Sequence, residues 1–154
     1  MLYLLIKWVH VLAAITALGS NITYGFWMVR ASRDPAVLPF TLRTIKLIDD
    51  RIANPAYGLL LITGLAMIWV SGYPFHTPWL ELAFALYVVM FFLGLFGYTP
   101  TLKRQIAALD RGGISSPEYQ AAAARGRLLG ALLGVVVIAI VFLMVVKPAL
   151  WGAA

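Results

Sequence analysis

Lys7 and His10 form the one cluster of ionisable residues within an apolar stretch of this sequence. They lie near the start of residues 2–29, and a helix would place them on the same face, one turn apart. Ionisable side chains inside a membrane span are rare, because lipid solvates charge poorly, and they indicate a functional site by default. This pair is therefore the first candidate for chemistry.

The helical face that carries His10 is lined with small residues. At about 100° per residue, one stripe of the helix contains Lys7, His10, Ala14, Ala17, Asn21 and Gly25. Such a face can receive either another helix or a flat cofactor. Simpler interpretations stay open for three of these residues. Lys7 can extend its amine to the nearby interface, His10 can be a packed histidine that is hydrogen-bonded across the bundle, and Asn21 can join two helices.

Several other chemistries are excluded by what the sequence lacks. It contains no cysteine, which excludes disulfides, iron–sulfur clusters and zinc–thiolate sites. It shows no HExxH motif, phosphate-binding loop, Ser/His/Asp triad or paired carboxylates within a span, so hydrolases, kinases and ion or solute transporters are not supported. Copper or zinc needs clustered ligands, whereas the second histidine, His76, is expected to be solvated in a loop.

Four apolar stretches must position these residues. Of the 154 residues, 62% are hydrophobic and 12% are charged, whereas a soluble domain carries roughly 25% charged residues. A domain of this size could not bury so much apolar surface, so its solvent must be lipid. The stretches, each near the roughly 20 residues that cross a bilayer, are residues 2–29, 52–70, 79–98 and 128–146. The sequence predicts one transmembrane domain, 1–154, that is an all-α, integral membrane four-helix bundle.

The distribution of basic residues predicts how the bundle is oriented. Five lysines and arginines lie in residues 30–51 and five in residues 99–127, whereas residues 71–78 contain none. Short cytoplasmic segments retain Lys and Arg, so 30–51 and 99–127 are expected to be cytoplasmic loops, with both termini outside the cytoplasm. The basic residues form no single patch with interleaved aromatics, which argues against nucleic acid as a partner.

Local signals predict where two of the helices begin. Thr77 and Pro78 are typical of an N-cap followed by a first-turn proline. Residues 115–118 read Ser-Ser-Pro-Glu, which is typical of a capping box, so the fourth helix is expected to begin near Pro117, ahead of its apolar stretch. Residues 41–50 alternate apolar and charged side chains and fit either an extension of the second helix or an interfacial helix.

Four segments carry a family resemblance that spans nearly the whole chain. They are LIKWVHVLAAITALGSNITYGFWMVRA at the start, then RIANPAYGLLLITGLAMIW, PWLELAFALYVVMFFLGLFGY and IAIVFLMVVKP. In order and spacing they resemble the HemJ-type protoporphyrinogen oxidases and, more distantly, the CopD copper-resistance membrane domain. The KWVH start resembles most closely a group of uncharacterised bacterial predicted integral membrane proteins. The resemblance implies a four-helix haem b protein with His10 as an axial ligand of the iron and Lys7, Ala14, Ala17 and Asn21 on the haem-facing stripe.

Two positions depart from the HemJ pattern. Those enzymes carry a functional lysine four residues after the tryptophan that opens helix three, where this chain has Ala83. They also carry an acidic residue early in helix four, where this chain has Ala131. The loss of both argues against protoporphyrinogen oxidation and leaves haem binding through His10 as the expectation.

The expected function is haem b binding with an electron-transfer or redox role in the bacterial inner membrane. Expected partners are the lipid bilayer, a quinone or another redox membrane protein, and a second copy of the chain. One alternative is a protoporphyrinogen IX oxidase of the HemJ type, a membrane oxidoreductase. Another is a non-catalytic bundle that packs with other membrane proteins through the small ridge of Gly126, Gly130 and Gly134.

Overall fold

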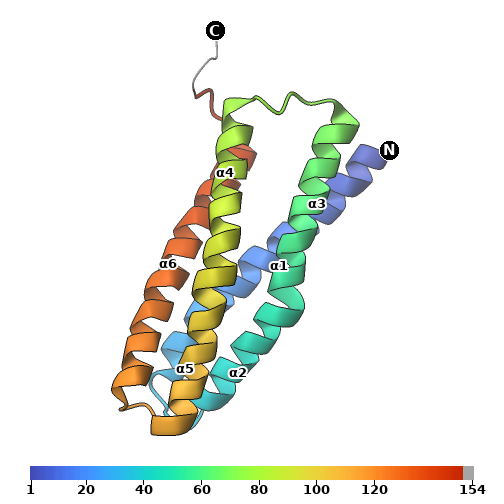
Figure 1. Cartoon of the computed structure of the whole chain (residues 1–154). Coiled ribbons are helices and arrows are strands. Elements are labelled where there is room, and N and C mark those ends of the chain that lie inside the picture. The colour runs from blue at the N-terminus through green and yellow to red at the C-terminus, as the bar shows by residue number, and fades with distance from the viewer. Residues whose placement is uncertain (151–154) are drawn as a thin grey trace.

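The chain folds into a bundle of long helices (Figure 1). The computed structural model describes residues 1–150. The last four residues of the expected domain, 151–154, lie outside the described part. In chain order the helices are α1 (Leu2–Ala31), α2 (Leu38–Ile48), the π-helix η1 (Asp49–Ala53), α3 (Asn54–Ser71), α4 (Pro78–Phe92), the π-helix η2 (Leu93–Tyr98), α5 (Thr99–Gly112) and α6 (Pro117–Val146). Residues 1–150 contain no β-strand.

These segments join into four continuous helices, which confirms the expected all-α architecture. Each is long and apolar enough to cross a membrane, and they run over Leu2–Ala31, Leu38–Ser71, Pro78–Gly112 and Pro117–Val146. Within an apolar segment of 18 residues in each helix, only 11% to 17% of the residues are buried inside the protein. Most apolar side chains therefore face outward, which a helix tolerates when its surroundings are hydrocarbon rather than water.

The basic segments that were expected to be loops are mostly helical. α2 and η1 lead directly into α3, so residues 41–50 extend the second helix and do not form a separate interfacial helix. α5 continues the third helix through residues 99–112. Both extensions are amphipathic, with buried residues at helical spacing: Leu38, Thr41, Leu42 and Ile45 in α2, and Thr101, Leu102, Gln105, Ala108 and Leu109 in α5. Burial of one face explains why these charged segments are helical.

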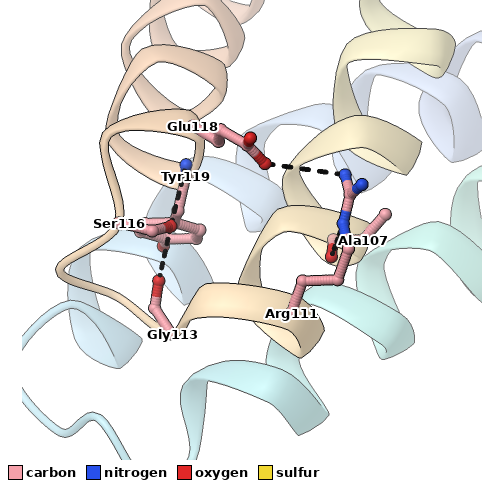
Figure 2. Close-up of polar contacts among 6 residues, drawn as sticks. All are labelled: Ala107, Arg111, Gly113, Ser116, Glu118 and Tyr119. Atoms are coloured by element: carbon pink, nitrogen blue, oxygen red, sulfur yellow. Dashed lines mark hydrogen bonds and ion pairs between the residues drawn. The ribbon is translucent and has the colours of Figure 1, made fainter.

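α6 begins at Pro117, as the sequence predicts, and its cap is half of a capping box. The Oγ atom of Ser116 accepts a hydrogen bond from the backbone N–H of Tyr119 at 3.2 Å (Figure 2). The complete box expected from residues 115–118 does not form, because with Ser116 as N-cap the third helical position is Tyr119, and Glu118 pairs with Arg111 at 3.7 Å instead. Thr77 precedes α4 at the N-cap position, but its hydroxyl accepts no hydrogen bond from the helix and donates to the Pro74 carbonyl.

The buried core lies at one end of the bundle, which we call the basic end. The basic end comprises the last turns of α1, the whole of α2, η1, η2 and α5, and the first turns of α6 (Figure 1). The core residues are Tyr24, Ala31, Leu38, Leu42, Ile45, Ala53, Leu102, Ala108, Leu109, Tyr119 and Ala123. We call the opposite end the terminal end; it contains the start of α1, the connection between α3 and α4, and the end of α6 (Figure 1).

The helices pair differently along their length. α1 packs chiefly against α3, and α4 packs chiefly against α6. At the basic end α5 packs on α6 and α2 packs on α5, which ties the two pairs together. α3 and α4 are linked at the terminal end by residues 72–77, where Gly72 ends α3 in the left-handed conformation with φ of 63°. His10 is therefore placed within the α1–α3 pair.

Candidate functional site

His10 lies on α1, about two turns from the Leu2 end, and its ring contacts α3. The Nδ1 atom is 2.8 Å from Oγ1 of Thr63. The Thr63 hydroxyl donates to the Leu59 carbonyl at 2.6 Å, which leaves its oxygen lone pairs for an N–H donor and favours the tautomer in which Nδ1 of His10 carries the imidazole proton. In this tautomer Nε2 keeps a free lone pair. The hydrogen bond thus sets both the tautomer and the orientation of the ring.

Gly64 lies directly beside the imidazole on α3. A Cβ atom at this position would lie 3.4 Å from Cε1 of His10, at the near limit of ordinary van der Waals contact, so glycine leaves the ring room on this side. With glycine there, the flat ring can lie against the helix while Nδ1 reaches Thr63. The half-buried side chain of His10 therefore contacts α3 at Thr63 and Gly64. Sequence analysis missed both residues, because neither type is distinctive in an apolar helix.

The small-residue stripe of α1 faces α3 along its middle. Ala17 is buried, Ala14 is half-buried, and Asn21 donates its side-chain amide to Oη of Tyr57 on α3. Asn21 therefore joins two helices, the simpler of the roles considered for it. Lys7 is exposed near the start of α1. The stripe as assembled consists of His10, Ala14, Ala17 and Asn21.

The two positions that differ from the HemJ pattern hold only methyl groups. Ala83 is 0% exposed in α4, and Ala131 is exposed on α6. His76 lies in the connection between α3 and α4, where its side chain is 92% exposed and Nδ1 is 3.0 Å from Oε1 of Glu81. Within residues 1–150, no group of three or more His, Cys, Asp or Glu side chains could hold a metal ion.

A second polar region, which sequence analysis missed, lies at the basic end. Asp49 of η1 is 6% exposed and accepts a hydrogen bond from Nδ2 of Asn54 at 3.3 Å. Lys46 pairs with Asp50 instead of Asp49, so no basic side chain of the described residues pairs with the buried carboxylate. Tyr24 of α1 is 4% exposed, and its hydroxyl has no hydrogen-bond partner among residues 1–150. π-helical turns such as η1 often mark functional positions, and here the turn carries the buried carboxylate.

The periodicity of α2 could have located Asp49. Leu38, Leu42 and Ile45 define the buried face, and Asp49 follows at the next helical interval. Sequence analysis considered residues 41–50 only as an extension of the second helix or an interfacial helix, and did not assign Asp49 to the apolar face. A charged residue on the apolar face of an amphipathic helix is the signal that identifies such a position.

Comparison with known proteins places the chain in a family. No curated protein and no solved structure matches it. A family model described as a predicted integral membrane protein (DUF2269) matches residues 4–148, which is nearly the whole chain and includes all four long helices in large part. The chain therefore belongs to the DUF2269 family of predicted integral membrane proteins.

Proposed function

We propose that this membrane protein binds haem b through Nε2 of His10 and that it transfers electrons within the membrane. The observation that supports this proposal is the bond from Nδ1 of His10 to Thr63. Histidines that bind metals almost always donate their other ring N–H to a protein acceptor, which orients the ring and raises the basicity of the ligating nitrogen. Thr63 has this role for His10, and the free lone pair of Nε2 is the one that iron would use.

The surroundings of His10 fit a planar group better than a bare ion. Ala14 and Gly64 carry little or no side chain, so few atoms beside the imidazole would block a planar group, whereas Ala17 is already buried in the contact between α1 and α3. The absence of further clustered ligands among residues 1–150 disfavours zinc or copper, which need several protein ligands. Haem brings four ring nitrogens of its own, so one histidine from the chain is enough to attach it, and it would supply one-electron chemistry there.

Protoporphyrinogen oxidation is the alternative that the family resemblance suggests, and the structure offers it less support. The position of the HemJ lysine is Ala83, which is completely buried and has no ionisable group. Lys7, the nearest lysine in sequence to His10, is exposed on α1 and does not replace it. Electron transfer requires no such residue, and its partners would be a quinone or another redox protein of the membrane.

We further propose that the basic end faces the cytoplasm of a bacterial cell, with the termini on the other side of the inner membrane. Ten lysines and arginines lie in residues 30–51 and 99–127, all at the basic end, and none lies in residues 71–78. In intact cells, the variant His76→Cys is expected to react with an impermeant maleimide, and Ser115→Cys, exposed at the basic end, is expected to be protected. The reverse labelling pattern would overturn this orientation.

The test of haem binding is the visible spectrum of the protein purified in mild detergent after expression with excess haem. A bound haem gives a Soret band that sharpens on reduction and a stoichiometry near one per chain. A colourless protein, or haem that washes away from the folded protein, would refute the proposal. Because folding is read separately by circular dichroism, an unfolded sample cannot be mistaken for a protein that does not bind haem.

A further inference from the structure

A groove of about 340 Å³ lies between α5 and α6 at the basic end. Its lining includes three alanines, Ala108 of α5 with Ala121 and Ala122 of α6, together with Arg104 and Arg125. The small alanine side chains leave space between the two helices. A Cβ atom at Gly126 would lie 3.4 Å from Oε1 of Gln105, so glycine permits this close approach.

The groove contains positive charge without matching negative charge. Arg111, at its outer end, is paired with Glu118 at 3.7 Å and donates from Nε to the Ala107 carbonyl (Figure 2). The side chains of Arg104 and Arg125 make no ion pair and no hydrogen bond with any of the residues 1–150. Two guanidinium groups therefore flank a groove whose one carboxylate is already engaged, which favours an anionic ligand.

The groove lies at the depth of the lipid headgroups. The apolar part of α6 begins at Leu128, three residues after Arg125, and that of the third helix ends at Tyr98, six residues before Arg104. At about 1.5 Å per residue, Arg125 lies roughly 5 Å and Arg104 roughly 9 Å from the hydrocarbon boundary. The headgroup layer is roughly 5–8 Å thick on each face. Both side chains are long enough to reach a phosphate in that layer.

We propose that this groove binds the phosphate of an anionic phospholipid, with Arg104 and Arg125 as its ligands. Basic pockets between transmembrane helices are known to receive such headgroups. The acyl chains would follow α6, where Leu128 and Leu132 continue the face of Arg125 at helical spacing and are exposed. This continuity of a charged groove with an apolar face favours a lipid over a free anion.

The test measures retention of phosphatidylglycerol by the purified full-length protein, using native mass spectrometry with phosphatidylcholine as the neutral comparison. In Arg104→Gln combined with Arg125→Gln, retention of phosphatidylglycerol is expected to fall roughly tenfold or more, because each basic side chain near the surface contributes to anionic lipid binding. The matched control combines Lys103→Gln with Arg127→Gln, which removes the same charge from the same helices outside the groove. The control is expected to retain the lipid.

Three results would overturn the proposal. Equal loss in the groove variant and its control would show that the lipid responds to net charge and not to this groove. Unchanged retention in the groove variant would exclude Arg104 and Arg125 as ligands. Displacement of the lipid by millimolar inorganic phosphate would identify the ligand as a soluble anion. The variants are compared only after equal helical content has been shown, and both pairs are surface residues, so loss of folding does not obscure the result.

Discussion

The basic end and the terminal end of the bundle are held together in different ways. At the basic end, four helices share one buried cluster in which Leu42 and Ile45 of α2 are the largest fully buried side chains. At the terminal end, the contact between α1 and α3 buries small residues such as Ala13, Ala17 and Thr63. Large apolar side chains there mostly point away from the protein.

The difference follows from the solvent around each end. The helices of the basic end carry charged outer faces and extend beyond the apolar stretches, so water drives their apolar faces together. Lipid solvates apolar side chains as well as a protein core does, so helices in lipid associate through close packing and hydrogen bonds. The bonds from His10 to Thr63, from Asn21 to Tyr57 and from Tyr87 to the Tyr57 carbonyl are of that kind.

The largest expected effect concerns the chemistry at the terminal end. His10→Ala should abolish or greatly reduce haem retention, because the iron loses the only ligand that the chain is proposed to supply. The Soret absorbance per protein measures this loss. His76→Ala is the control, since His76 is exposed in the connecting segment and should leave the band in place. Full haem content in the His10 variant would remove the ligand assignment, and loss only in the His76 variant would move the site to that segment.

The basic end should be the more sensitive to a cavity. Leu42→Ala removes a fully buried side chain of the cluster and should lower the free energy of unfolding by about 2–5 kcal/mol. Leu47→Ala, on the same helix but 58% exposed, should change it by about 0.5 kcal/mol or less. Denaturant unfolding in mild detergent, followed by circular dichroism, compares them. Similar losses in both variants would show that the cluster is not what stabilises this end.

The same contrast explains what could be predicted from the sequence. The four spans were predictable, because long apolar runs have no stable place except in lipid, and the start of α6 was predictable from Ser116 and Pro117. The helicity of α5 was not, because its apolar face is narrow and its average composition is polar. Hydropathy reveals elements that lipid surrounds, whereas elements that water surrounds must be found from their periodicity.

Of the candidate site, only the residue on α1 could be predicted from the sequence, and its neighbours on α3 could not. His10 was identified because a histidine is unusual inside an apolar span, a property of the residue itself. Its partner Thr63 and its neighbour Gly64 depend on which helix packs against α1 and on the register of that contact, which no local pattern reveals. Lys7 was placed on the stripe by helical angle alone, which does not reveal that its side chain is exposed.

A stability effect of intermediate size is expected where α6 contacts η2. A Cβ atom at Gly130 would lie 3.7 Å from Cε2 of Tyr98, whereas one at Gly134 would have no neighbour within 4 Å. Gly130→Leu should therefore overpack the contact and lower stability by about 1–3 kcal/mol, and Gly134→Leu should be nearly neutral. Thermal unfolding in detergent compares the two variants. If both were neutral, the glycine ridge would not be a close helix contact within the chain.

The smallest expected effect is the loss of a single hydrogen bond at the terminal end. Thr63→Val preserves the shape of the side chain but removes the acceptor for Nδ1 of His10, and should cost roughly 0.5–1.5 kcal/mol of stability. Thr63→Ser retains the hydroxyl and should be close to the unmodified protein in both stability and haem retention. Weakened haem retention in the valine variant but not in the serine variant would assign the hydroxyl to orienting His10. Equal retention in the two variants, with haem bound, would show that the imidazole is held in place by packing against Gly64 alone.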